Sequence, residues 1–155
     1  MCQKTKQLLA LILRDGPRGV TSLLKISYLI DLAAIRNIGK PISEFKYIRW
    51  NFGPFDSTIY KNLENMREEG TISAESCFFG SDEHVVYNLT DPTSVETDSL
   101  SPDELNIIST MLEHVQGYGA KTLTEIAYNT KPMVLIGATL GGTEHMGEVL
   151  NMYAA

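Results

Sequence analysis

The sequence has few of the residues on which disulfide-rich, membrane-spanning or secreted proteins depend. Its two cysteines, Cys2 and Cys77, form no C-x-x-C pair and no metal-binding spacing, so we expect a reduced, cytoplasmic protein. No apolar run approaches the roughly 20 residues of a membrane span. The early apolar run extends only from Leu8 to Leu13, and Arg14 ends it without a small-residue cleavage site. We therefore expect no disulfide framework, no membrane association and no signal peptide.

Motifs that would indicate catalysis are also missing. The histidines, His84, His114 and His145, each follow a glutamate, but adjacent residues on a helix point to different faces and no H-E-x-x-H motif occurs. The glycine-rich stretch over residues 137–143 lacks the lysine of a phosphate-binding loop. There is no G-x-S-x-G motif, and neither cysteine has a histidine nearby. The sequence predicts a non-enzymatic protein with no cofactor and no metal.

Basic residues are scarce in the second part of the chain. Residues 1–67 hold 11 of the 13 lysines and arginines and five of the 19 acidic residues, a net charge of +6. The remaining 88 residues carry −12, and the total is −6. Such a division can indicate a charged partner or nucleic acid, or it can disappear when the fold mixes the two parts. We leave both interpretations open at this point.

The chain is long enough for one domain with a sizeable core, and its apolar pattern predicts a mainly α fold with a small β-hairpin, an α+β class. This order, helices followed by a hairpin, is also typical of a winged-helix fold, so the chain has winged-helix-like elements. We expect a helical core with an aromatic strand and hairpin over 1–90, a linker over 91–99, C-terminal helices over 100–132 and a weakly predicted tail over 133–155. The predicted elements are helices over 3–14, 21–37 and 57–69, strands over 48–52, 71–73, 77–79 and 84–89, and a short final helix over 144–153.

Two helix starts are legible in the later part of the chain. In LSPDEL, Ser101 is the expected N-cap, Pro102 occupies the first helical position, and Glu104 completes a capping box. Thr122 and Glu125 have the same spacing and predict a second capping box, for a shorter helix that ends near residues 131–132.

The stretch YIRWNFGPFDSTIY, residues 47–60, holds the single tryptophan and two of the five phenylalanines. Its alternation predicts a short strand that ends at Gly53-Pro54. We expect Ile48, Trp50 and Phe52 to face the core. The opposite set would then point outward around the turn, with Lys46 nearby: Tyr47, Arg49, Asn51 and Phe55.

Nucleic-acid binding is an alternative function. The charge distribution disfavours it but does not exclude it. The expected recognition helix, residues 57–69, offers Lys61 and Arg67 but also three glutamates. The hairpin turn adds Asp82 and Glu83, so this surface should repel phosphate. A better basic patch consists of Arg36, Lys40, Lys46 and Arg49.

Several stretches together resemble a known family. They are LLKISYLIDLAAIRNIGKPI, YIRWNFGPFDSTIY, LSPDELNIISTMLEH and LTEIAYNTKPM, and they resemble the Panacea domain of SocA-like, phage-associated antitoxins. The resemblance is strong over 23–70, moderate over 100–132 and absent beyond. Many members have a small aliphatic residue where Phe55 stands here. The motif positions that carry the resemblance are Tyr28, Asp31, Leu32, Gly39, Pro41, Ile42, Tyr47, Trp50, Gly53, Pro54 and Tyr60.

The resemblance implies a bacterial antitoxin that binds and neutralises a protein toxin encoded nearby. One type in the family instead acts as an adaptor that delivers its toxin to a AAA+ protease. Because Tyr, Trp and Arg most often anchor interfaces, the expected partner-binding residues are those of the aromatic stretch: Lys46, Tyr47, Arg49, Trp50, Asn51 and Phe55.

Two further positions have competing interpretations. Asp31 lies on an otherwise apolar helix, and we expect a buried carboxylate that pairs with Arg36 or caps a backbone segment, in preference to a direct role in binding. The terminal Ala154-Ala155 resembles the end of a bacterial degradation tag, which would suit an antitoxin with rapid turnover; small residues at a disordered end are the alternative.

Overall fold

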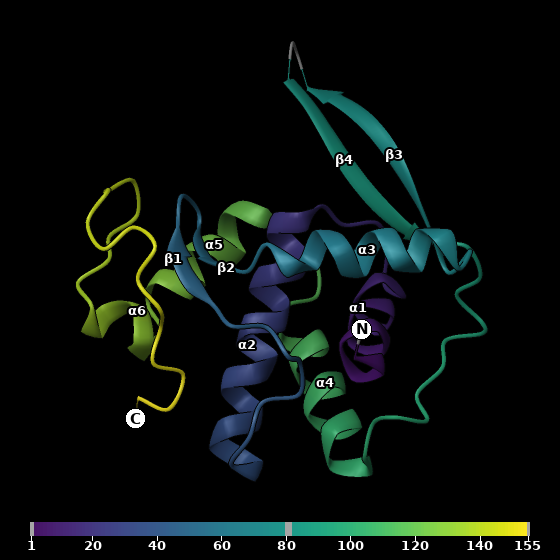
Figure 1. The fold of residues 1–155 in the computed structure, drawn as a ribbon, viewed down its shortest axis with the longest axis horizontal. Helices are drawn as coiled ribbons and strands as arrows, with labels where there is room; N and C mark the ends of the chain where they lie inside the picture. The colour runs from purple at the N-terminus through teal and green to yellow at the C-terminus, as the bar shows by residue number, and fades with distance from the viewer. Residues whose placement is uncertain (1, 80–81, 155) are drawn as a thin grey trace.

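The computed structural model describes residues 2–79 and 82–154 (Figure 1). Over these residues the chain forms six helices and two small antiparallel sheets of two strands each, which confirms the predicted α+β class. The helices are α1 (Gln3–Leu13), α2 (Val20–Ile38), α3 (Thr58–Glu68), α4 (Pro102–His114), α5 (Ala120–Tyr128) and α6 (Lys131–Leu135). The strands are β1 (Ile48–Trp50), β2 (Gly53–Phe55), β3 (Ile72–Phe79) and β4 (Asp82–Leu89).

Helix α2 is the centre of the molecule. It is apolar on nearly all sides, as expected of a helix packed by several neighbours. Helices α1, α4 and α5 and strand β2 all contact it, and its residues 22–31 are buried throughout. The helix ends at Gly39, whose left-handed φ of 77° closes the C-terminus through an N–H bond to the Ile35 carbonyl. Family-motif residues Tyr28 and Asp31 therefore lie in the core.

The two helix starts have different outcomes. The capping box of α4 is confirmed: the Ser101 hydroxyl accepts the Glu104 N–H (3.1 Å) and the Glu104 carboxylate accepts the Ser101 N–H (2.9 Å). The predicted second box is wrong, because α5 begins at Ala120 after Gly119 and has no side-chain cap. A further short helix, α6, begins where the sequence predicted an end, near residue 131.

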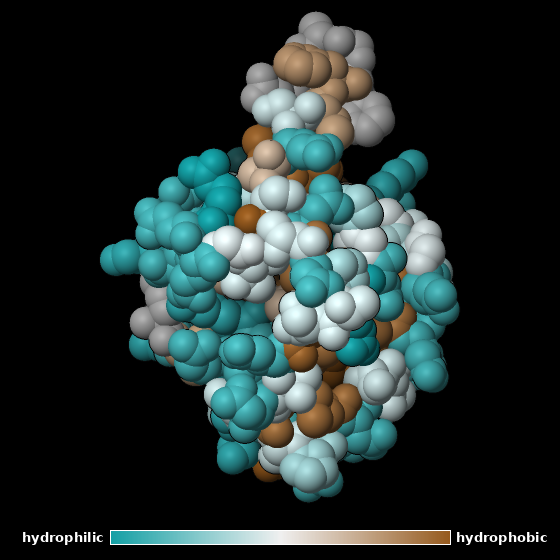
Figure 2. Space-filling view, turned by 90° about the vertical axis from the view of Figure 1, so that its right-hand side faces the viewer, coloured by the Kyte–Doolittle hydropathy of each residue, from teal (hydrophilic) through white to brown (hydrophobic). Residues whose placement is uncertain are grey.

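Strands β3 and β4 form a hairpin that projects from the body beyond α3 (Figures 1 and 2). The sequence divided the first of these strands into two pieces, 71–73 and 77–79, and this division is wrong, since β3 is continuous. The predicted turn covers residues 80–83: residues 80–81 lie outside the described residues, and the assignment of Asp82 and Glu83 to the turn is wrong, since both belong to β4. At the root of the hairpin, Tyr87 exchanges two backbone hydrogen bonds with Arg18, which joins β4 to the segment before α2.

The sequence predicted that Gly53 and Pro54 end the aromatic strand, and this prediction is wrong. They belong to β2, which folds back on β1 after a two-residue turn at Asn51 and Phe52, with Trp50 opposite Gly53. Arg49 lies opposite Pro54, at the pair where β1 directs its N–H and C=O outward. Proline therefore removes no hydrogen bond between these strands.

Residues 137–153, here called the C-terminal segment, form neither the predicted helix over 144–153 nor any other helix. The segment runs beside β1 (Figure 1) and forms one bridge, Val149 opposite Ile48. The helix prediction failed because the conformation of this segment is set by pairing with β1, which lies far away in the sequence. Of the terminal Ala154-Ala155 pair, Ala155 lies outside the described residues, so the degradation tag stays a prediction.

Candidate partner-binding site

The aromatic strand is turned over relative to the prediction. Tyr47 is 2% exposed and Arg49 0%, whereas Trp50 is 42% exposed and Phe52 62%. Alternation is thus present, but the two faces are exchanged. Trp50 is consequently not packed in the core, and Tyr47 and Arg49 do not face outward.

Arg49 is buried because the C-terminal segment folds over it. One terminal nitrogen donates to the carbonyls of Thr139 (3.1 Å) and Gly142 (2.8 Å), and the other donates to the Trp50 carbonyl. The guanidinium carbon lies 5.3 Å from the centre of the Tyr128 ring. No carboxylate in the described part of the chain forms an ion pair with this arginine. Arg49 is therefore a clamp for backbone carbonyls.

Four aromatic residues, here called the aromatic face, line the outer side of β1, β2 and the start of α3: Trp50, Phe52, Phe55 and Tyr60. Trp50 stacks on Phe55 with ring centroids 6.3 Å apart, and Phe55 lies 6.3 Å from Tyr60. Tyr60 is 53% exposed. Among the predicted partner-binding residues, Lys46 and Asn51 are exposed beside this face and Phe55 is half-buried.

A groove of about 780 Å³ adjoins the aromatic face. It is lined by the N-terminal turn of α2, by strand β4 and by helix α5, and also by Phe52, Tyr60 and Leu140. The sequence analysis placed Phe52 in the core, whereas the side chain is exposed. The signal that could have found it is its place in a two-residue turn, where a side chain projects away from the strands.

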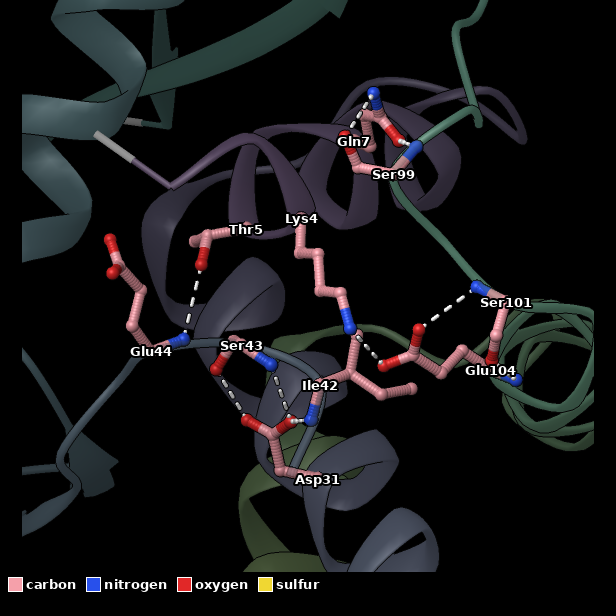
Figure 3. A network of polar contacts seen from close by, with 10 residues as sticks. All are labelled: Lys4, Thr5, Gln7, Asp31, Ile42, Ser43, Glu44, Ser99, Ser101 and Glu104. Atoms are coloured by element: carbon pink, nitrogen blue, oxygen red, sulfur yellow. Dashed lines mark hydrogen bonds and ion pairs between the residues drawn. The ribbon is translucent and has the colours of Figure 1, made fainter. Parts of the chain in front are cut away.

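The turn after α2, which precedes β1, is fixed by Asp31 (Figure 3). One carboxylate oxygen accepts the backbone N–H groups of Ile42 (2.8 Å) and Ser43 (3.0 Å). The other accepts the hydroxyls of Ser43 (2.5 Å) and Tyr47 (2.7 Å). Burial raises the pKa of the Asp31 carboxyl, and these four hydrogen bonds act in the opposite direction. Of the two expected structural roles, the backbone cap is the one present, not a pair with Arg36.

The start of α1 contacts both this turn and the start of α4. The Thr5 hydroxyl accepts the Glu44 N–H (3.1 Å), and Lys4 forms an ion pair with Glu104 (3.0 Å; Figure 3). Behind the turn, the rings of Tyr28 and Tyr47 meet edge to face at 5.2 Å. These contacts position the start of β1 through elements from distant parts of the sequence.

Strand β2 is held from behind by Lys25 of α2. Its ammonium is buried and donates to the Pro54 carbonyl (2.9 Å). Gly53 has a φ of 101°, and a Cβ there would lie 3.4 Å from the Lys25 stem and 3.5 Å from Tyr128. Only glycine therefore fits without strain. Family-motif residue Pro41, just after Gly39, is half-buried.

Lys25 should make stability depend on pH. Burial lowers the pKa of its ammonium from 10.5 to about 8. Between these values the unfolded chain binds more protons than the folded one, so the unfolding free energy should rise with pH by about 1 kcal/mol per unit. Urea unfolding at pH 7.5, 8.5 and 9.5 measures this slope. Lys25→Met should lose it, whereas an equal slope in both proteins would contradict the assignment.

The winged-helix alternative gains no support from α3. Arg67 forms an ion pair with Glu64 (3.0 Å) on the exposed side of this helix. The face of the molecule in Figure 2 is teal or white over most of its area, and its apolar side chains gather in the lower middle and at the hairpin. Among the described residues, no group of three or more His, Cys, Asp or Glu side chains is placed to hold a metal. No described helix has both the length and the apolar character needed to cross a membrane.

Comparison with protein families places the chain among antitoxin domains. Residues 23–132 match the family described as "Antitoxin SocA-like, Panacea domain". The match covers more than half of the chain, which therefore belongs to this family. Domains of this antitoxin family are typically non-enzymatic, and membership implies a cognate toxin. Comparisons with curated proteins and with solved structures gave no match.

Proposed function

We propose that this antitoxin-family protein neutralises its toxin by direct binding, and that the aromatic face with Lys46 and Asn51 is the contact surface. The observation that carries the proposal is the exposure of Trp50 and Phe52 on the β1–β2 hairpin. Exposed aromatic side chains cost little conformational entropy when they become buried, and they are enriched among the residues that dominate binding energy.

The surrounding contacts favour a preorganised surface. Trp50, Phe55 and Tyr60 contact one another in series, so each ring limits the freedom of the next. Lys46 is tied at its backbone to the Asp56 carboxylate (2.7 Å), which leaves its side chain free to reach outward. A partner would then meet an apolar centre with a polar rim, the usual anatomy of an interface.

The test is co-expression with the product of the adjacent reading frame, with growth and co-purification scored together. If this product arrests growth alone, we expect the wild-type protein to restore growth and to co-purify with it. The double variant Trp50→Ala/Phe52→Ala should lose both effects, while its melting temperature changes by only a few degrees, because exposed positions contribute roughly 0.5 kcal/mol or less each.

A matched control removes exposed apolar side chains elsewhere. Tyr118→Ala/Leu135→Ala, at positions 40% and 60% exposed, should retain rescue and co-purification. Full binding by the Trp50/Phe52 variant would disprove the assigned surface. Toxin that disappears only in protease-competent cells would instead indicate the adaptor mechanism.

A further inference from the structure

We propose that the edge of β1 covered by the C-terminal segment is an acceptor site for an extended, carboxylate-bearing strand of the partner, and that this strand displaces the segment. The inference rests on the proposed function, since it concerns how the same hairpin engages the partner. It adds two points: the partner strand carries a carboxylate, and the C-terminal segment competes with that strand for the edge of β1.

The backbone pairing at this edge depends little on side chains. Arg49 donates its N–H to the Glu148 carbonyl (2.8 Å) and accepts the Gly147 N–H (2.6 Å), while Leu150 donates to the Tyr47 carbonyl (3.0 Å). Any extended chain can form this ladder, which is the basis of recognition by strand addition. The edge is therefore already shown to accept a strand, with the protein's own segment as its present occupant.

Apart from the Arg49 clamp and the backbone ladder, few contacts hold the present occupant. Within the C-terminal segment only Ala138 and Leu150 are buried, and Val149 is 70% exposed. His145 has a left-handed φ of 63°, which is unfavourable for a residue with a side chain. Segments with few buried apolar contacts and exposed backbone bonds open at low free-energy cost. The segment can therefore leave without unfolding of the helical core.

The positive charge of Arg49 indicates that the strand replacing the C-terminal segment should carry a carboxylate. The Arg49 guanidinium is buried among carbonyls, and its Nε–H has no acceptor among the described residues. Glu148 of the C-terminal segment directs its carboxylate to His145 (2.7 Å) and not to Arg49. Because a buried cation is stabilised best by a carboxylate that accepts two parallel hydrogen bonds, an acidic strand gains an interaction that the segment does not supply.

The acceptor edge continues into the aromatic face. Ile48 and Val149 are opposite each other on the bridge between β1 and the C-terminal segment, and Ile48 lines a hollow with Trp50 and Phe55. A strand in the place of the segment would thus reach the aromatic rings with its outward side chains. One partner segment would use the ladder, Arg49 and the aromatic face together.

A reversible lock tests the displacement. Ile48→Cys/Val149→Cys, in a Cys2→Ser/Cys77→Ser background, joins the pair at which no ladder hydrogen bond intervenes, a geometry close enough for a disulfide. Binding of the purified product of the adjacent reading frame is measured for the oxidised and the reduced forms. We expect the oxidised form to bind at least roughly tenfold more weakly, because its edge cannot open. The reduced form of the same double variant is the reference for the oxidised form, and Val149→Cys alone should bind like wild type.

Amide hydrogen exchange in the complex gives a second, independent readout. On binding, the Gly147 and Leu150 amides should lose protection, whereas the Arg49 amide should keep it, since a partner carbonyl replaces that of Glu148. Equal binding by oxidised and reduced forms, or increased protection of all three amides, overturns the displacement and leaves the proposed function intact. Failure of the wild-type protein to bind overturns both.

Discussion

Asp31→Ala is expected to lower the melting temperature by about 10 °C, because it leaves buried N–H groups without an acceptor. The carboxylate is fully buried and accepts four hydrogen bonds, two from backbone N–H groups and two from hydroxyls. Alanine leaves the amides of Ile42 and Ser43 without an acceptor. Each buried unsatisfied donor costs about 1–3 kcal/mol, and a chain of this size loses roughly 2–4 °C per kcal/mol.

The conservative variant separates the geometry of Asp31 from its charge. Asp31→Asn retains one oxygen for the two amides, but its NH₂ group faces the Ser43 and Tyr47 hydroxyls, which must reorient to accept. We expect a smaller loss, about 1–2 kcal/mol, with folding intact. Thermal and urea unfolding by circular dichroism measure both variants.

An exposed acid serves as the control for Asp31. Glu113→Ala, on the solvent side of α4, should leave the unfolding free energy within about 0.5 kcal/mol of wild type. If Asp31→Asn were as stable as wild type yet failed to rescue growth, Asp31 would have a direct role in neutralisation. Asp31→Ala with unchanged stability would refute the role assigned to the cap.

The parts of the fold that could be predicted are those whose order is local. The capping box at Ser101 and Glu104 lies within four residues, and its hydrogen bonds form as the spacing predicts. The apolar surface of α2 on nearly all sides indicates its central place without reference to any partner. In both cases the physical cause is contained in the segment itself.

The orientation of β1 could not be predicted, because alternation fixes two faces without saying which is buried. One face has Ile48, Trp50 and Phe52, and apolarity alone favours its burial. The other face has Tyr47 and Arg49, and it is buried because distant groups satisfy it. Asp31 accepts the tyrosine hydroxyl, and carbonyls some 90 residues later accept the arginine.

This inversion divides the candidate site between two roles. Tyr47 and Arg49, expected to face outward, are instead buried, and in the free protein they hold the β1–β2 hairpin and the C-terminal segment in place. Trp50, Asn51 and Lys46 keep the exposure that a contact surface requires, and Phe55 is partly accessible. A double substitution of Arg49 and Phe55 would therefore confuse loss of structure with loss of binding, so the surface test uses Trp50 and Phe52.

Arg49→Leu is expected to free the C-terminal segment while the helical core stays folded. Leucine keeps apolar volume but leaves the carbonyls of Trp50, Thr139 and Gly142 without their donor. A loss of about 3 kcal/mol in the local opening free energy corresponds to roughly a hundredfold faster exchange of the Gly147 and Leu150 amides. The global melting temperature should fall much less than in Asp31→Ala, because this segment supplies few core residues.

Hydrogen exchange followed by mass spectrometry, with limited proteolysis after residue 138, measures this release. The control is Arg36→Leu, which removes an exposed arginine and should change neither exchange nor cleavage in the segment. Unchanged exchange in Arg49→Leu would show that the backbone ladder alone holds the segment. Rapid exchange confined to residues 139–150 would identify Arg49 as the clamp, and an acidic strand would then have to satisfy the same guanidinium to take the place of the segment.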